Sequence, residues 1–271
     1  MINWLFVPGN RPDRFFKAAA SGADAVIWDL EDAVAPGAKD AARTTVATHL
    51  AMPEARAVPV VVRLNATTTA AGLSDLLMLQ AAGHPPEAVI LPKTENRWQV
   101  QQVRMMLAPG VKVVALIESA TGLADSRAIL AGRVDAVFFG AGDYSSDIGA
   151  ECSWAPLQSA RSRLVEAAAE AGVPAIDSPF FDVQDNAALA DECRAARAFG
   201  FSGKAAIHPR QVATIMDCFR PTESEIDWAQ RALAENEKGA GVVDGKLIDE
   251  AIARRARRIL GWQTSGWLGP A

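Results

Sequence analysis

Eight short apolar runs alternate along the chain with alanine-rich segments whose apolar residues recur at helical spacing. The runs occupy residues 3–7, 25–29, 58–64, 88–92, 112–117, 135–140, 173–177 and 203–207. They are almost continuously apolar, which is typical of parallel strands buried on both faces. The segments between them, such as 155–171 and 183–199, have the length and spacing of helices. Eight β/α units in about 210 residues favour a (β/α)₈ TIM barrel over an open doubly wound sheet.

The pattern changes after the eighth unit. Thr222 is a suitable N-cap for a helix that runs to about residue 239. A glycine-rich break follows at 239–245, and 246–260 has the pattern of a final helix. We therefore expect a barrel over 1–220 and a C-terminal helical extension over 221–271, which the barrel does not need for its closure.

Composition narrows the range of partners. The chain of 271 residues is half apolar and has a formal net charge of −5, which gives no general attraction to nucleic acid or anionic membranes. No apolar run approaches the ~20 residues that span a bilayer, and the first residues lack the layout of a signal peptide. Cys152, Cys193 and Cys218 lie far apart without metal-ligand spacing, and their odd number disfavours a disulfide framework. We expect a cytoplasmic protein.

Several of the predicted strands end in charged residues. A buried carboxylate must be paired, hydrogen-bonded or bound to a metal. In a (β/α)₈ barrel the carboxyl ends of all strands meet at one mouth, where active sites lie. The charged residues and the histidine at or near these ends are Asp29, Glu31, Asp32, Arg63, Lys93, Glu118, Asp143, Asp177 and His208. The sequence therefore predicts one mouth lined with acids and a few cations.

Glu118 and Asp143 are the strongest candidates for metal ligands. Carboxylate oxygens without nearby histidine or cysteine clusters favour Mg²⁺, which takes one or two carboxylates and completes its shell with water or substrate. Glu31 and Asp32 are placed to hold metal-bound waters. The guanidinium of Arg63 suits a substrate carboxylate or carbonyl. Taken singly, each acid could instead cap a helix or form a surface ion pair, and Arg63 could form a salt bridge at the rim.

A second group of cations lies at the predicted start of the first helix. Arg11, Arg14 and Lys17 could reinforce phosphate binding at this helix N-terminus, although basic residues on a surface helix are often only solvated. The nearby glycines form neither a dinucleotide-binding nor a P-loop motif.

Eight segments in order resemble the citrate lyase beta-subunit / HpcH-HpaI aldolase family, especially its malyl-CoA and citramalyl-CoA lyases. They are LFVPGNRPDRFFKAAASGADAVIWDLEDAV, VVVRLN, ILPKTE, VALIESATGL, FFGAGDYSSDIG, PAIDSPFFDVQD, GFSGKAAIHPRQV and DGKLIDEAIARRARRIL. The resemblance implies a (β/α)₈ barrel with Mg²⁺ at its mouth, reversible cleavage of a carbon–carbon bond, and homotrimers or hexamers. One departure is Ile2, where many relatives carry an arginine.

The resemblance also implies roles for individual residues. Glu118 and Asp143 match the metal ligands, and Glu31 and Asp32 match residues around the metal's waters. Arg63 matches the arginine that holds the oxo-acid portion of the substrate. The remaining substrate- and CoA-binding positions are Phe6, Arg11, Lys17, Gly142, Lys204, Ile207 and His208. Asp249 matches an aspartate on the C-terminal extension that reaches into the site of a neighbouring subunit.

These residues suit a retro-aldol cleavage. A 3-hydroxyacyl-CoA thioester of the malyl, citramalyl or citryl type would give an oxo acid and acetyl-CoA or a related acyl-CoA. Mg²⁺ and Arg63 would stabilise negative charge on the oxo acid, and Asp249 is the candidate base for the synthetic direction. Two alternatives remain open. One is a CoA-independent aldolase acting on free 4-hydroxy-2-oxo acids, and the other is a citrate lyase beta subunit acting on a carrier-bound acyl group.

Overall fold

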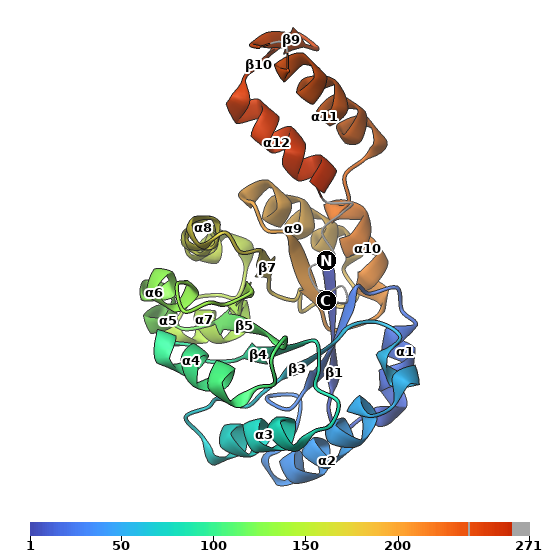
Figure 1. The fold of residues 1–271 in the computed structure, drawn as a ribbon, viewed down its shortest axis with the longest axis vertical. Helices are drawn as coiled ribbons and strands as arrows, with labels where there is room; N and C mark the ends of the chain where they lie inside the picture. The colour runs from blue at the N-terminus through green and yellow to red at the C-terminus, as the bar shows by residue number, and fades with distance from the viewer. Residues whose placement is uncertain (238, 262–271) are drawn as a thin grey trace. The chain divides into compact units, whose positions relative to one another are not determined.

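The computed structural model describes residues 1–237 and 239–261, and eight parallel strands in residues 1–219 close into a barrel (Figure 1). The strands are β1 (Asn3–Pro8), β2 (Ala25–Asp29), β3 (Val60–Arg63), β4 (Ala88–Leu91), β5 (Lys112–Ile117), β6 (Ala136–Phe139), β7 (Ala175–Asp177) and β8 (Gly203–Ala206). Each strand pairs with the next, and β1 also pairs with β8. The predicted fold class is confirmed.

Helices lie around the outside of the barrel (Figure 1). They are α1 (Phe15–Ala19), α2 (Lys39–Leu50), α3 (Ala70–Ala81), α4 (Arg97–Met106), α5 (Ala120–Ala124), α6 (Ser126–Leu130), α7 (Ala141–Ile148), α8 (Trp154–Ala171), α9 (Asn186–Phe199) and α10 (Arg210–Phe219). Short 3₁₀ turns occupy Pro12–Arg14, Pro36–Ala38 and Pro53–Arg56. Asn96 and Gln99 form a capping box that fixes the start of α4. No helix among the described residues combines the length and apolarity needed to cross a membrane.

The barrel strands are the core of the molecule. Every residue of β2, β4 and β6 is buried, as their continuous apolar runs predict. Two of the predicted strands, 58–64 and 173–177, begin two residues later in the structure because Pro59 and Pro174 have no N–H to give to the sheet. Both prolines still contribute through their carbonyl oxygens, which accept hydrogen bonds from Val26 and Val137.

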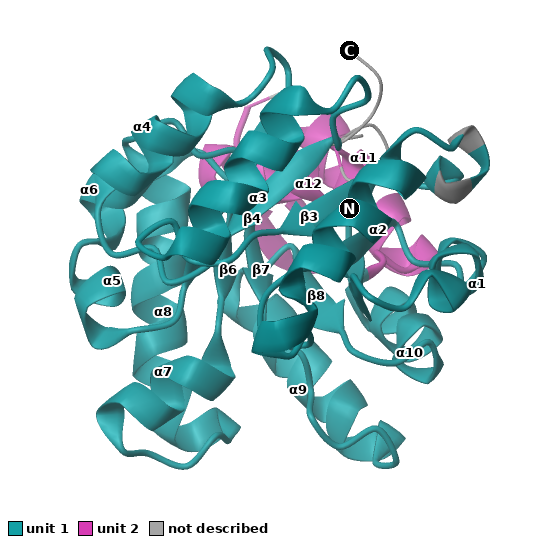
Figure 2. Ribbon diagram, turned by 90° about the horizontal axis from the view of Figure 1, so that it is seen from below, with its two compact units in different colours: residues 1–219, 270–271 teal, residues 220–269 magenta. Residues whose placement is uncertain are grey.

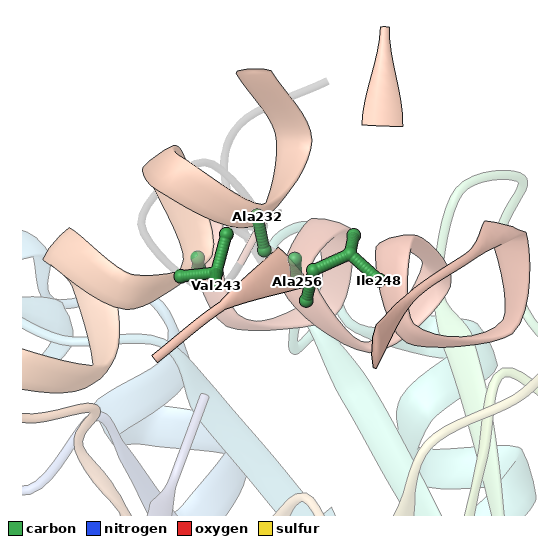
Figure 3. Packing of buried hydrophobic residues seen from close by; sticks show 5 residues of the cluster. Ala232, Val243, Ile248 and Ala256 are labelled. Carbon is green, nitrogen blue, oxygen red and sulfur yellow. The ribbon is translucent and has the colours of Figure 1, made fainter. Parts of the chain in front are cut away.

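A second compact unit begins at Arg220 (Figure 2). It contains α11 (Glu223–Asn236), the antiparallel strands β9 (Gly241–Val243) and β10 (Lys246–Ile248), and α12 (Glu250–Gly261). Its small core consists of Ala229, Ala232, Val243, Ile248 and Ala256 (Figure 3). As predicted, Thr222 is the N-cap of the first helix, within a capping box completed by Glu225.

The prediction of one helix over 246–260 is wrong at its start. Residues 241–248 form a hairpin, and α12 begins only at Glu250. The hairpin turns at Asp244 and Gly245, whose φ angles of 51° and 74° are those of a type I′ turn. Arg231 holds the turn through two hydrogen bonds of 2.7 and 2.9 Å to the Asp244 carboxylate. The glycines of this segment therefore build a hairpin and not an open break.

Candidate functional site

The carboxyl ends of the barrel strands surround a cavity of about 260 Å³. Its walls come from β1, β2, β3, β5, β6 and α7 and from the segments that follow β7 and β8. The predicted site residues that line it are Phe6, Asp32, Arg63, Glu118, Gly142, Asp143 and Ile207. Leu116, Phe138, Phe139 and Phe181 give the cavity an apolar part.

Arg63 is held in place by Asp29. The two residues are register partners at the ends of β3 and β2. Arg63 Nε and Nη2 each donate to one Asp29 carboxylate oxygen at 2.7 Å. The carboxylate also accepts the backbone N–H groups of Glu31 and Ala33. Burial by itself lowers the pKa of Arg63, but the charges of Asp29 and Glu31 outweigh it and raise that pKa. The guanidinium is thus a fixed cation whose Nη1 makes no hydrogen bond with Asp29, and it lies 5.0 Å from the centre of the Phe6 ring.

Glu31 is buried beside this arginine, whereas Asp32 is exposed. Glu31 Oε2 lies 3.0 Å from Arg63 Nη1, as an ion pair that lacks hydrogen-bond geometry. Burial raises the pKa of Glu31 above its usual range. The Asp32 carboxylate, whose side chain is 59% exposed, lies 3.9 Å from both Arg63 Nη1 and Lys93 Nζ. Asp32 therefore lines the cavity, whereas Glu31 lies between Arg63 and Lys93 with an Oε2 that accepts no hydrogen bond from the described residues.

The side chain of Lys93 lies between Glu31 and Asp143. Its Nζ donates to Glu31 Oε1 at 2.6 Å and lies 3.8 Å from Asp143 Oδ2. Burial alone lowers the pKa of Lys93, but the hydrogen bond to Glu31 and the surrounding acids raise it. The side chain is therefore an ammonium at neutral pH.

Glu118 follows the last residue of β5 and is buried. Its Oε1 accepts the backbone N–H of Lys93 at 2.7 Å. Burial, together with the charge of Glu31 and that of Asp143, raises its pKa to about 8. Space for this side chain depends on Gly140, since a Cβ at that position would lie 2.5 Å from Glu118 Cβ and 2.7 Å from Glu118 Oε2. A cation bound beside this carboxyl would favour its ionised form.

Asp143 provides the second predicted ligand. It lies in the first turn of α7, and its side chain is 46% exposed toward the mouth. Gly142 beside it is also constrained, because a Cβ there would lie 3.3 Å from the Phe181 ring.

The donor atoms at this mouth suit a hard cation. Within residues 1–237 and 239–261, no three His, Cys, Asp or Glu side chains are gathered as a complete set of metal ligands. Mg²⁺ needs no such set, because it usually binds one or two carboxylates and keeps several waters. Glu31 Oε2, which is ion-paired with Arg63 but accepts no hydrogen bond from the described part of the chain, can accept one from such a water. The residues present therefore fit a magnesium ion held by Glu118 and Asp143.

The expectation that Lys204 binds substrate needs correction. Lys204 is the second residue of β8, and its side chain has no exposed surface. Its Nζ donates to Asp177 and Glu192, both at 2.6 Å, and Arg161 donates to the same Asp177 carboxylate at 2.9 Å. Because its ammonium is used in this buried network, Lys204 ties β7 and β8 to α9 and does not face the cavity.

Three of the predicted CoA-binding residues, Arg11, Lys17 and His208, do not line the cavity, whereas Phe6, Gly142 and Ile207 do. Arg11 is exposed and forms two hydrogen bonds with Asp13, at 2.9 and 2.8 Å. Lys17 is exposed on α1. His208 Nδ1 accepts the backbone N–H of Arg210 at 3.2 Å. These positions leave the predicted roles in CoA binding as predictions.

Asp249 lies in the second unit. Its Oδ1 accepts the backbone N–H of Ile252 at 3.0 Å, so it caps α12. The predicted role of this carboxylate in the site of a neighbouring subunit also stays a prediction.

Sequence reasoning assigned no role to three residues that organise the site. The sequence places Asp29 at the mouth as the end of a strand, but its pairing with Arg63 depends on the register of β2 and β3. The place of Gly140 at a strand end gave a weaker signal. Lys93 has a positive φ of 49°, and nothing in the sequence predicts that conformation for a lysine.

Known proteins resemble this chain over nearly its whole length. A "Citrate lyase subunit beta-like protein" from Mycobacterium tuberculosis is 36% identical over 267 residues, covering 95% of this chain and 93% of that protein. A "Citramalyl-CoA lyase, mitochondrial" from Rattus norvegicus is 30% identical, covering 96% of this chain and 85% of the relative. Among solved structures, CitE from Mycobacterium tuberculosis in complex with magnesium, acetoacetate and coenzyme A superposes with a TM-score of 0.83 at 34% identity. That match covers 97% of this chain and 98% of the other.

The family assignment follows from a match that includes the whole barrel. The model of the HpcH/HpaI aldolase/citrate lyase family matches residues 3–209, from the start of β1 to just beyond β8. The chain belongs to the HpcH/HpaI aldolase/citrate lyase family.

Proposed function

We propose that this protein is a Mg²⁺-dependent carbon–carbon lyase that cleaves a 3-hydroxyacyl-CoA thioester to an oxo acid and acetyl-CoA or a related acyl-CoA. The substrate would be of the malyl, citramalyl or citryl type. The observation that carries the proposal is the convergence of Glu118, Asp143 and Arg63 on one cavity at the barrel mouth. A structural relative with the same fold binds magnesium, acetoacetate and coenzyme A.

Glu118 and Asp143 would hold the magnesium ion, with Glu31 and Asp32 binding its waters. When bound there, Mg²⁺ supplies a Lewis acid for the oxygens of the oxo acid. The pKa of about 8 for Glu118 is that of the metal-free protein, and a divalent cation would favour its ionised form.

Arg63 would bind the carboxylate of the oxo acid through Nη1. Asp29 holds the other two nitrogens of the guanidinium, so the donor is already oriented when substrate enters. Phe6, Phe138 and Phe139 would limit the access of water to the reacting atoms. The exclusion of water strengthens the attraction between Arg63 and the charge that develops on the oxo acid.

Asp249 would move the proton at the α-carbon of the thioester. In the cleavage direction the carbon–carbon bond breaks, the hydroxyl proton leaves and the enolate carbon gains a proton. In the synthetic direction Asp249 would remove that proton again. We propose that this carboxylate acts in the site of a neighbouring subunit of a homotrimer or hexamer, where the C-terminal unit that carries it packs beside the neighbour's cavity.

CoA would extend outward from the cavity toward the first helix. Arg11 and Lys17 would pair with the nucleotide phosphates, while Ile207, His208 and Gly142 would border the entrance. Arg11 would have to leave Asp13, which costs little because the pair is exposed. The three free thiols and the net charge of −5 favour a cytoplasmic enzyme that binds neither nucleic acid nor membrane.

An assay with three classes of substrate tests this function. The purified protein with Mg²⁺ is given malyl-, citramalyl- and citryl-CoA, the same acyl groups on an acyl carrier protein, and free 4-hydroxy-2-oxo acids. We expect turnover of at least one CoA thioester. Activity only with the carrier protein would indicate a citrate lyase beta subunit instead. The relative from Mycobacterium tuberculosis at 36% identity, which is named as similar to such a subunit, is the reason to test this alternative. Aldehyde formed from free oxo acids would indicate a CoA-independent aldolase.

A further inference from the structure

Lys93 contacts both sides of the proposed metal site. Its backbone N–H donates to Glu118 Oε1 at 2.7 Å, and its Nζ lies 3.8 Å from Asp143 Oδ2. The same Nζ donates to Glu31 at 2.6 Å and lies 3.9 Å from Asp32. One residue therefore interacts with the two proposed metal ligands and with the two acids that would hold the metal's waters.

The backbone fixes this position. Lys93 has a φ of 49°, in the left-handed region that a lysine rarely adopts. The conformation persists because its N–H is bound by Glu118 and its carbonyl oxygen accepts Gln99 Nε2 at 3.1 Å. Gln99 in turn belongs to the capping box of α4. The strained backbone directs the side chain toward the mouth, where four acids meet.

The acidic side chains around Lys93 favour a positive charge at its position. Arg63 is bound to Asp29 and lies beside Glu31, on one side of the cavity. Asp143 lies on the other side, and the ammonium of Lys93 reaches toward it. Without a metal, this ammonium reduces the repulsion between the carboxylates, which would otherwise stand against one another at short range.

We propose that Lys93 is the built-in counter-cation of the metal site and competes with Mg²⁺ for its carboxylates. It thereby lowers the affinity of the substrate-free protein for the metal. This inference rests on the proposed function, because it takes Glu118 and Asp143 as the metal ligands. It assigns to Lys93 a role in setting metal affinity.

Metal binding measured without substrate tests the proposal. Metal-free protein is titrated with Mn²⁺ at fixed pH and ionic strength, and free Mn²⁺ is read by electron paramagnetic resonance. Lys93→Met keeps an unbranched side chain that is one atom shorter and removes its charge, and we expect its Kd for Mn²⁺ to fall about tenfold. Lys93→Arg keeps the charge and should stay near the wild-type Kd. Arg127→Met removes an equal charge from the exposed face of α6, where Arg127 pairs with Glu170, and should leave the Kd for Mn²⁺ unchanged.

The outcomes separate this inference from the proposed function. A Kd that is unchanged or higher in Lys93→Met, or equally lowered in Lys93→Arg, overturns the role of Lys93. Glu118→Gln should lose Mn²⁺ binding. If it binds Mn²⁺ as the wild type does, then the proposed metal site itself is wrong. Thermal unfolding shows whether each variant is folded, and Lys93→Gln replaces Lys93→Met if the latter is not.

Discussion

Asp29 and Arg63 are register partners at the ends of β2 and β3, and their side chains form two hydrogen bonds of 2.7 Å. The barrel register therefore sets the orientation of the guanidinium at the mouth. Because Asp29 also accepts the N–H groups of Glu31 and Ala33, the same carboxylate shapes the turn that carries the acids after β2. The pair therefore links the proposed oxo-acid site to the proposed metal site through one strand end.

Asp29→Asn tests this relationship. The amide keeps the shape of the side chain but not its charge, so Arg63 becomes a buried cation with a weakened partner. We expect kcat/KM to fall about 100-fold, as displacement of a positioned group by about 1 Å commonly does. The free energy of unfolding should fall by about 3–5 kcal/mol, as on breaking a buried ion pair. Kinetics and urea unfolding measure the two effects. Wild-type kcat/KM in this variant would show that Arg63 does not need Asp29.

Gly140→Ala should weaken metal binding. The added Cβ would lie 2.5 Å from Glu118 Cβ, and neither atom is at the end of a flexible chain. Glu118 must therefore shift, and we expect the Kd for Mn²⁺ to rise about tenfold or more, as on loss of a residue that orients a ligand.

The matched control is Gly37→Ala, where a Cβ has no neighbour within 4 Å. Its metal affinity should equal that of the wild type. If Gly140→Ala also bound Mn²⁺ like the wild type, Glu118 would not be a ligand in the position that the structure gives it.

The sequence predicts the barrel well because its strands are buried on both faces, which makes their apolar runs continuous. It also locates the mouth, since Glu118 follows β5 and Asp143 lies in the first turn after β6. The sequence does not show that Lys204 lies away from the mouth, because Lys204 is only a few residues before Ile207 and His208. Lys204 is the second residue of β8, and its side chain is buried against α9, where Asp177 and Glu192 neutralise it.

The C-terminal unit was predicted less well. The Asp244-Gly245 pair is a strong signal for a hairpin, but the strands on either side have only three residues each. A strand of three residues is too short to show the alternation of apolar and polar residues, so its sequence can equally be assigned to the first turn of a helix. Tertiary packing of Val243 and Ile248 on the two helices decides in favour of the hairpin.

Lys204→Met should reduce stability and leave CoA binding intact. It leaves the buried Asp177 with Arg161 as its remaining cation, and we expect the free energy of unfolding to fall by about 3–5 kcal/mol. The KM for an acyl-CoA thioester, measured well below the unfolding temperature, should not change. A KM raised many-fold in a variant of wild-type stability would restore the binding role first predicted for Lys204.

Complementation tests whether Asp249 acts across subunits. Asp249→Asn and Glu118→Gln should each be inactive, because one lacks the proton acceptor and the other a metal ligand. Mixing them under conditions of subunit exchange should restore part of the activity, since some sites then combine both intact residues from different chains. Subunit exchange shown by fluorescence energy transfer, without any recovery of activity, would place Asp249 within its own subunit's site or outside the chemistry.

The most direct measurement follows the products of one CoA thioester with time. The substrate that the protein turns over is incubated with wild-type protein, and the oxo acid and the acyl-CoA are quantified separately. We predict that the two appear in equal amounts with Mg²⁺ present, that EDTA stops both, and that Glu118→Gln forms neither. Products formed at an undiminished rate in EDTA, or by Glu118→Gln, would contradict a magnesium-dependent lyase at this barrel mouth.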